Sequence, residues 1–238
     1  MGLKGTRILV VGGASGIGHA VARAAQAEGA EIVIASTSED KLKFASLRLG
    51  GAEWAVLDIT DEAAVAAWFA TSGDYSHIVS TAGDWGKARR GPFTEMDFRE
   101  AEALFRVRFW GSAILAKHGA KCVPPGGSIT LTAGMSAFRP SVGSVMATAM
   151  AGSVEHLTWG LAKELAPVRV NAVFPGGVAT EIFTGLPEDL RKAEEARFIL
   201  GHSGANLLAT DAGLAALARA AAQGTQVREF IGLPSETS

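Results

Sequence analysis

The sequence predicts a single α/β domain in which a doubly wound parallel sheet of seven strands is flanked by helices. Short runs of β-branched residues alternate along the chain with alanine-rich segments of helical period, which is the pattern of a parallel sheet covered on both faces. A glycine-rich turn, with Gly12, Gly16 and Gly18, leads from the first such run into the first helical segment. The length of 238 residues suits one domain of this kind, so residues 1–238 are taken as one unit.

Each expected strand is a short apolar run bounded by turn residues or charges, and each expected helix carries apolar residues at helical spacing. The strands are expected at residues 7–11, 31–35, 53–57, 77–80, 128–132, 168–174 and 226–231. The helices are expected at residues 16–28, 39–47, 61–71, 96–121, 144–165, 187–199 and 210–223. Thr60, Thr94 and Thr210 precede acidic residues, as helix starts often do. The segment 184–208 is the least sheet-like and is expected to form a substrate lid over the carboxyl ends of the strands.

Composition excludes several classes of function. The net charge of -2 and the pI near 6.2 give no basic surplus for nucleic acid or anionic lipid. Every apolar stretch is interrupted before it is long enough to cross a bilayer, and no signal-peptide pattern precedes the first strand. Cys122 is the only cysteine, so a reducing, cytoplasmic location is expected. No metal is expected, because no His, Cys, Asp and Glu cluster has metal-ligand spacing.

The first expected strand leads directly into a glycine-rich turn, within the sequence RILVVGGASGIG. Gly12, Gly16 and Gly18 stand where strand gives way to helix, which is the context of the dinucleotide-binding turn in Rossmann-type folds. A side chain there would block the tight turn, the approach of a pyrophosphate and the packing of helix on strand. A purely structural glycine turn is the alternative, and the spacing favours dinucleotide binding.

These motifs resemble those of the short-chain dehydrogenase/reductase family. Asp58 matches the family's acid that binds the adenine amino group, Ser80-Thr81-Ala82-Gly83 stands where the family has NNAG, and Pro175-Gly176 with a following threonine matches its PG motif. The resemblance covers roughly residues 7–180. The cofactor-binding residues that it implies are Gly12, Ser15, Gly16, Ile17, Gly18, Ser36, Thr37, Ser38, Asp58, Ile59, Thr81, Ala82, Gly83, Pro175, Gly176, Val178 and Thr180.

The residues after the second strand bear on the choice between NADP and NAD. A carboxylate there would bind the adenosine ribose and repel a 2'-phosphate. This chain has Ser36, Thr37 and Ser38 instead, and Lys41 follows one turn later. Hydroxyls without an acid favour NADP, whereas NAD stays possible because no arginine stands beside them. The same residues also suit a simple helix cap.

The resemblance implies a catalytic asparagine, serine, tyrosine and lysine, and this chain has none of them at the matching positions. Aligned on Val154-Glu155, the lysine position falls on Ala151 and the tyrosine position on Ala147. The serine position falls on Ala133 or Gly134, and the asparagine position falls on Arg108. We therefore expect a degenerate catalytic site, with the catalytic residues unknown.

The chain's one tyrosine, Tyr75, precedes the fourth strand and is expected at the wrong edge of the sheet for catalysis, as a surface or packing residue. Ser136, Ser141 and Ser144 are candidate ligands of a substrate oxygen. The other interpretation is that these serines serve turns and helix caps, Ser144 above all.

Charged residues supply further candidates. Arg108 suits a clamp on a carboxylate or carbonyl, and it suits equally a side chain that, like Arg106, faces water or a partner subunit. His156 titrates in the right range, yet its helical spacing points it towards an interface. Four charged residues after the fourth strand suit an anionic substrate or a solvated loop: Asp84, Lys87, Arg89 and Arg90.

Two functions remain open at this point. The first is an NADP(H)-dependent oxidoreductase that acts on a small carbonyl or alcohol and takes its proton from a source other than tyrosine. The second is a cofactor-binding protein without redox turnover, such as a sensor, a regulatory subunit or a non-redox enzyme. Thr180 and the PG motif favour the first. The resemblance also implies a homodimer or homotetramer.

Overall fold

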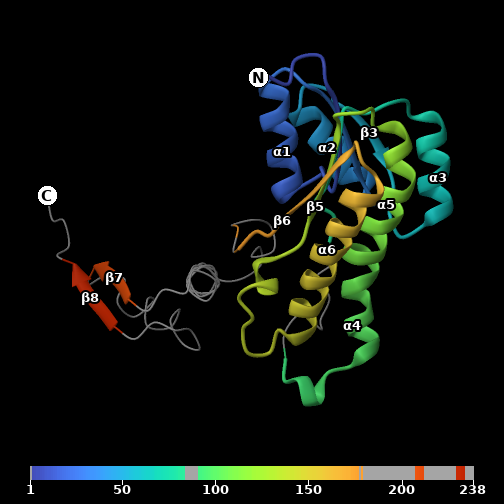
Figure 1. Cartoon of the computed structure of the whole chain (residues 1–238). Coiled ribbons are helices and arrows are strands. Elements are labelled where there is room, and N and C mark those ends of the chain that lie inside the picture. The colour runs from blue at the N-terminus through green and yellow to red at the C-terminus, as the bar shows by residue number, and fades with distance from the viewer. Residues whose placement is uncertain (1, 84–90, 177, 179–206, 212–228, 234–238) are drawn as a thin grey trace, which may run out of the picture.

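The computed structural model describes residues 2–83, 91–176, 178, 207–211 and 229–233, and its centre is a parallel sheet with helices on both faces (Figure 1). The sheet has six strands in the order β3-β2-β1-β4-β5-β6, not the seven that the sequence predicts. Its strands are β1 (Arg7–Val11), β2 (Glu31–Ser36), β3 (Glu53–Val56), β4 (His77–Ser80), β5 (Ser128–Thr132) and β6 (Arg169–Val173). The order reverses between β1 and β4, where ligands bind in open α/β sheets.

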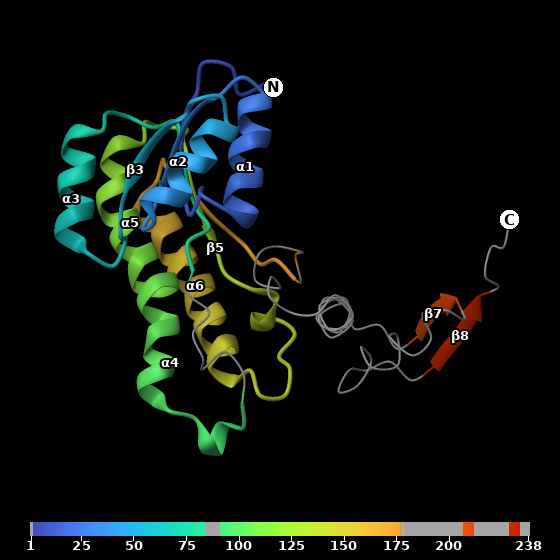
Figure 2. The same cartoon turned by 180° about the vertical axis from the view of Figure 1, so that it is seen from behind.

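The central strand β1 is buried on both faces, and its alternate side chains enter two cores. Ile8 and Val10 join the core beneath α1 (Gly16–Ala27) and α2 (Glu39–Arg48). Leu9 and Val11 join the larger core on the other face. That core is covered by α3 (Glu62–Thr71), α4 (Phe98–Phe105), α5 (Ser112–Gly119) and α6 (Val145–Glu164), as the two opposite views show (Figures 1 and 2). Two-sided burial explains why the strand is a continuous apolar run.

The long helix expected at 96–121 is a succession of shorter pieces. It begins at Phe98, where the Asp97 carboxylate accepts a hydrogen bond of 2.8 Å from the Arg99 amide. A π-helical turn, Arg106–Gly111, separates α4 from α5, and the 3-10 turn Ala120–Cys122 ends the element. A Cβ on Gly111 would lie 2.8 Å from Ile59, so the glycine lets this element approach the end of β3 closely.

The expectation that a seventh strand joins the main sheet is wrong, and so is the expected helix start at Thr210. Residues 212–223 of that expected helix lie outside the described residues. The strand β8 (Glu229–Leu233) pairs with β7 (Leu207–Asp211) in a separate two-stranded parallel sheet, with Thr210 opposite Gly232. Thr210 and Asp211 thus lie in a strand and do not begin a helix. The apolar run marks a strand, but its pairing partner depends on tertiary contacts that local pattern does not encode. The expected helix 187–199 and residues 184–206 of the expected lid lie outside the described residues.

No helix within the described ranges is long and apolar enough to cross a membrane.

Tyr75 is a core residue at the amino edge of the sheet. Its side chain is fully buried, and its ring makes a T-shaped contact with Phe69 at 6.2 Å. The Arg7 guanidinium lies 4.7 Å from the ring centre and bonds to Glu31 and Glu53. Burial raises the pKa of the Tyr75 phenol above its ordinary value, which keeps the ring neutral.

Two substitutions separate packing from chemistry at this position. Tyr75→Phe keeps the ring and its contacts, so we expect the free energy of unfolding to change by less than about 1 kcal/mol. Tyr75→Ala leaves a cavity in the larger core, and we expect a loss of about 3–5 kcal/mol. Denaturant unfolding followed by circular dichroism measures both. A loss for Tyr75→Phe as large as that for Tyr75→Ala would contradict the packing role.

Candidate functional site

The glycine turn brings three backbone segments together at the carboxyl end of β1. Gly12 and Gly16 have positive φ angles of 83° and 53°. A Cβ on Gly12 would lie 2.6 Å from the Thr81 Oγ1 and 2.8 Å from the Ala82 amide nitrogen. A Cβ on Gly18 would overlap the Gly12 carbonyl and the same Thr81 oxygen. The turn therefore needs glycine at these positions to approach the end of β4.

The N-terminus of α1 supplies the polar part of this turn. Ser15 is the N-cap residue, and its side chain makes no capping hydrogen bond. No acidic residue stands in the first turn of the helix. Unpaired amide groups and the positive end of the helix dipole form a binding site for phosphate groups. The missing Cβ atoms leave the space that a pyrophosphate needs, so Gly12, Ser15, Gly16, Ile17 and Gly18 fit the predicted dinucleotide.

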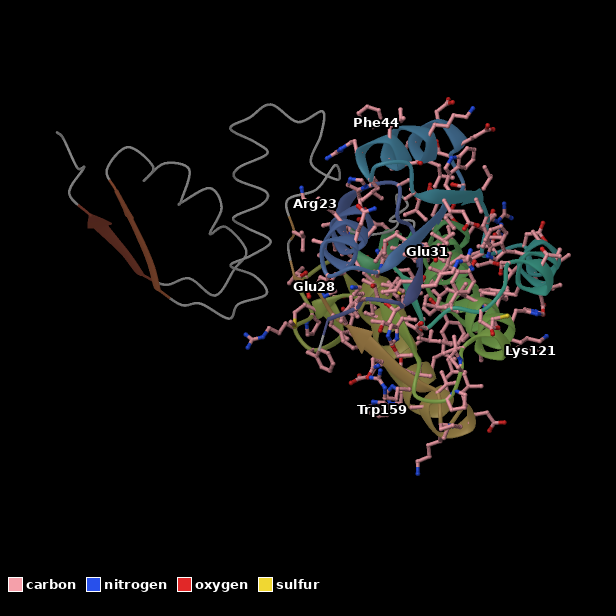
Figure 3. All side chains as sticks on the ribbon, turned by 90° about the horizontal axis from the view of Figure 1, so that it is seen from above. Arg23, Glu28, Glu31, Phe44, Lys121 and Trp159 are labelled. Atoms are coloured by element: carbon pink, nitrogen blue, oxygen red, sulfur yellow. The ribbon has the colours of Figure 1, made fainter. Side chains whose placement is uncertain are left out.

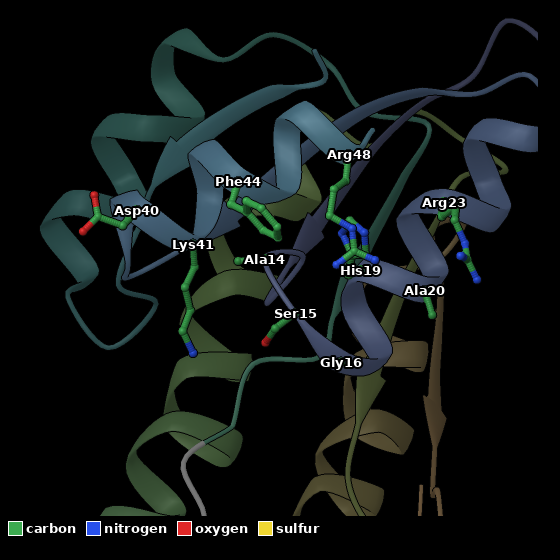
Figure 4. A pocket seen from close by; sticks show the side chains of 10 residues that line it. All are labelled: Ala14, Ser15, Gly16, His19, Ala20, Arg23, Asp40, Lys41, Phe44 and Arg48. Atoms are coloured by element: carbon green, nitrogen blue, oxygen red, sulfur yellow. The ribbon is translucent and has the colours of Figure 1, made fainter. Parts of the chain in front are cut away.

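A basic cavity of about 480 Å³ adjoins the same helix N-terminus, between α1 and α2 (Figure 4). Its lining includes His19 from α1 and Lys41 and Arg48 from α2, together with the N-cap residue Ser15. Arg23 on α1 and Phe44 on α2 also line the cavity, and both are labelled in the view from above (Figure 3). The charge of this cavity suits an anion beyond the pyrophosphate.

Sequence reasoning found only Lys41 of these cations. His19 and Arg23 share a face of α1, because they are four residues apart, and Arg48 lies two turns after Lys41 on α2. The sequence signal for this basic cavity was thus two pairs of basic residues at helical spacing, one pair on each of two neighbouring helices. Burial, and then the positive charge of Arg48, lower the pKa of His19 below its ordinary value.

The predicted residues after β2 and β3 lie at the same carboxyl edge. The Ser38 hydroxyl caps α2 by accepting a bond of 3.5 Å from the Lys41 amide, as the simple-cap interpretation has it. The Asp58 Oδ1 accepts hydrogen bonds of 2.9 and 2.8 Å from the amide and hydroxyl of Thr60, which orient the carboxylate. Ile59 is buried against the larger core.

Arg108 is buried at the carboxyl end of β5, with 5% of its surface exposed, so the expectation that it faces water is wrong. Its Nη1 donates hydrogen bonds of 3.1 Å to the Thr132 carbonyl and 3.3 Å to the Ala133 carbonyl. Arg106, two residues earlier, is exposed. Burial lowers the pKa of Arg108 to about 10, which leaves the guanidinium protonated at neutral pH.

Small residues line the region where α6 meets the end of β5. Ala147 and Ala151 are buried on one face of α6, and Ala133 is buried after β5. Ser136 joins the two elements, since its hydroxyl donates a 3.3 Å hydrogen bond to the Ala147 carbonyl. The fold thus brings together the positions to which the resemblance assigns the serine, tyrosine and lysine. Alanine side chains there offer no proton donor.

The other serines and His156 make local contacts. The Ser144 hydroxyl donates to the Ser141 carbonyl at 2.6 Å and lies 3.1 Å from the Ser141 hydroxyl. Ser144 is the N-cap residue of α6, although its side chain does not cap the helix. The His156 ring contacts Trp159 at 4.6 Å, and its Nδ1 lies 3.1 Å from the Gly152 carbonyl, on the exposed side of α6.

Pro175, Gly176 and Val178 follow β6, and the Pro175 carbonyl accepts a 2.9 Å hydrogen bond from the Met135 amide. The remaining predicted residues of the site lie outside the described residues: Asp84, Lys87, Arg89, Arg90 and Thr180. In the part of the chain that the structure describes, no three His, Cys, Asp or Glu side chains are grouped as metal ligands would be.

Comparisons with known proteins agree with this geometry. Residues 12–227 match the family model described as enoyl-(acyl carrier protein) reductase. The chain is 30% identical over 219 residues to a short-chain dehydrogenase/reductase of Stachybotrys chlorohalonatus, covering 80% of this chain and 81% of that protein. It is 33% identical over 205 residues to a cis-4-hydroxycyclohexanecarboxylate dehydrogenase of Sinomonas cyclohexanicum, covering 81% of each. The crystal structure of a small-chain dehydrogenase in complex with NADPH has a TM-score of 0.67 and 32% identity, over 96% of both chains.

Adding one methyl group at Gly18 tests the glycine turn. Gly18→Ala places a Cβ against the Gly12 carbonyl and Thr81, so we expect a loss of stability of about 1–3 kcal/mol and a large loss of dinucleotide binding. Gly160→Ala in α6 is the matched control, because a Cβ there meets nothing within 4 Å. We expect it to raise helix stability by about 1 kcal/mol. Thermal unfolding with and without NADPH measures both, and equal behaviour of the two variants would contradict the close contact.

Proposed function

The chain belongs to the short-chain dehydrogenase/reductase family, and we propose that it is an NADP(H)-dependent oxidoreductase that acts on a small carbonyl or alcohol and takes its proton from a source other than tyrosine. The observation that carries the proposal is the contact among Gly12, Gly18 and Thr81, because it forms a cradle that a single Cβ would fill. A bound nicotinamide supplies hydride chemistry, and the protein supplies orientation and electrostatics.

The cofactor extends along the carboxyl edge of the sheet. The turn Gly12–Gly18 and the N-terminus of α1 hold the pyrophosphate. Ser36, Thr37, Ser38 and Asp58, at the ends of β2 and β3, hold the adenosine half. The segment Thr81–Gly83 follows β4, on the side of the turn away from β2, and is proposed to hold the nicotinamide half. The residues after β6 are proposed to contact the same half: Pro175, Gly176, Val178 and Thr180.

The basic cavity between α1 and α2 supports NADP over NAD. Arg23, Lys41 and Arg48 line it together, with Asp40 as its one acidic lining residue, next to the segment that holds the adenosine ribose. A 2'-phosphate gains charge-assisted hydrogen bonds from such groups, whereas an NAD ribose has no charge to offer them.

The position of the one tyrosine supports an unusual proton source. Tyr75 contacts Arg7 at the amino end of β1, and the glycine turn follows the carboxyl end of that strand. The five residue steps from Arg7 to Gly12 span about 16 Å at ~3.3 Å per residue, far beyond proton-transfer reach. Ala147 and Ala151 occupy the positions to which the resemblance assigns the tyrosine and lysine, which supports a proton from the substrate, from water or from a serine-bound relay.

An aromatic pair after β5 and β6 supports an apolar substrate. Phe138 and Phe174 meet there in a tilted edge contact with ring centres 4.9 Å apart. Such a pair suits the carbon frame of a small ring, and one relative of this chain is a cis-4-hydroxycyclohexanecarboxylate dehydrogenase.

We further propose a homodimer or homotetramer in the cytoplasm. Large apolar side chains stay exposed on the helices of one face, namely Phe98, Trp110 and Trp159, each more than half exposed. Exposed aromatic residues of this kind are typical of subunit interfaces.

A single-turnover assay tests the redox function. NADPH that carries deuterium at the nicotinamide C4 is bound to the protein and mixed with cyclic ketones, quinones and imines. The absorbance of the NADPH and the deuterium content of the product are then measured. We expect transfer of the label to the substrate carbon, at a rate about 10²- to 10⁴-fold below that of enzymes with a positioned acid. Tight binding of NADPH with no transfer to any compound would support a protein without redox turnover.

Lys41→Gln tests the choice of cofactor. The substitution removes one cation from the 2'-phosphate site, so we expect Kd for NADPH to rise by about tenfold while Kd for NADH stays unchanged. Lys43→Gln is the control on the same helix, because Lys43 pairs with Glu39 at 2.8 Å on its exposed side. Fluorescence titration measures both affinities. An equal loss for NADPH and NADH would contradict the assignment.

A further inference from the structure

Arg108 connects two strands at the edge of the sheet where the cofactor is proposed to bind. It lies in the π-helical turn Arg106–Gly111, between α4 and α5. Its Nη1 donates to the carbonyls of Thr132, the last residue of β5, and of Ala133, the next residue. The planar guanidinium therefore holds the backbone at the point where β5 ends.

The other side of the same guanidinium lies against Gly83, after β4. A Cβ on Gly83 would overlap the Arg108 Nη2, Nε and Cζ atoms. Glycine at position 83 and arginine at position 108 therefore depend on each other, since any larger residue at 83 would displace a buried side chain from its two carbonyl partners.

The segment that Arg108 touches also forms one wall of the glycine turn. A Cβ on Gly12 would meet the Thr81 hydroxyl and the Ala82 amide, and Gly83 is the next residue along the chain. The three residues Thr81–Gly83 are thus held between the turn on one side and the guanidinium on the other. A shift of the Arg108 guanidinium would therefore move the backbone of Gly83, and with it the adjoining Thr81 and Ala82 that contact the glycine turn.

We infer that Arg108 is a positioning residue for the nicotinamide half of the cofactor site. It sets the distance between Gly83 and the Thr132–Ala133 backbone, so it shapes the space beside the reactive ring without being a proton donor. The adenosine half is proposed to lie at the ends of β2 and β3 and beside α1 and α2, whereas this guanidinium contacts the backbone after β4 and at the end of β5. The inference rests on the proposed function, because it assumes that a nicotinamide cofactor binds along this edge.

A double-variant cycle with two ligands tests the inference. The ligands are NADPH and 2',5'-ADP, which has the adenosine half alone, and the variants are Gly83→Ala, Arg108→Ala and both together. We expect each single variant to raise Kd for NADPH about tenfold, and the double variant to raise it about tenfold rather than a hundredfold, because the new methyl group enters the space that the guanidinium leaves. Kd for 2',5'-ADP stays at the wild-type value throughout.

Several outcomes would overturn the inference. One is additive losses in the double variant, and another is an equal loss of affinity for both ligands, which is the sign of a general effect on folding. Arg106→Ala is the control and leaves both affinities unchanged, since that side chain is exposed. If Arg108→Ala does not fold, Arg108→Lys takes its place in the cycle, because an ammonium lacks the planar atoms that overlap position 83.

If the wild-type protein binds 2',5'-ADP and NADPH yet the cycle is additive, only this inference fails. If the wild-type protein binds neither ligand, the proposed function fails and the inference with it.

Discussion

The site depends on the contact between the glycine turn and the end of β4. Gly12 and Gly18 bring backbone atoms of β1, α1 and β4 so close that a single methyl group would not fit between them. This closeness fixes three things at once: the crossing of α1 on the sheet, the direction of its N-terminal amides, and the position of Thr81–Gly83. The remaining parts of the site are arranged on either side of this contact, with the basic cavity towards β2 and Arg108 towards β5.

Arg108 links the end of β5 to the interior beneath α6. A long cation fills space near α6, where the neighbouring positions carry alanine, and it satisfies two carbonyl groups at the end of a strand. Burial of such a group is unfavourable unless its N-H groups are bonded, so the two carbonyls are part of the reason that it stays inside. The result is a rigid edge in which the polar groups support the backbone.

Much of this fold could be predicted from the sequence, and the errors have physical causes. The six strands of the main sheet and the glycine turn followed from periodicity and spacing, because two-sided burial leaves a strong apolar signal in β1 and β2. The run around Phe230 was correctly seen as a strand, but its partner was not, since pairing is decided by distant segments. For Arg108 the sequence left open a clamp on a substrate or a side chain facing water or a partner subunit, and its burial was not predicted, because a π-helical turn changes which residues face inward.

The site was harder to predict than the fold for a related reason. Lys41 was found because it stands close in sequence to Ser38, whereas His19, Arg23 and Arg48 become one cavity only when α1 and α2 lie side by side. Likewise, no pattern in the sequence pairs Gly83 with Arg108. Local motifs specify turns and caps, while clusters assembled from two elements require the packing of those elements.

The separation between the two halves of the site bears on how the catalytic positions can change. The proposed contacts of the adenosine half come from the ends of β2 and β3 and from α1 and α2, whereas Ala147 and Ala151 belong to α6 and Ala133 follows β5. In the proposed arrangement, an alanine in place of a proton donor on α6 or after β5 therefore removes no contact that holds the adenosine. What such a replacement changes is the barrier to proton transfer, which general acid catalysis lowers by about 3–5 kcal/mol.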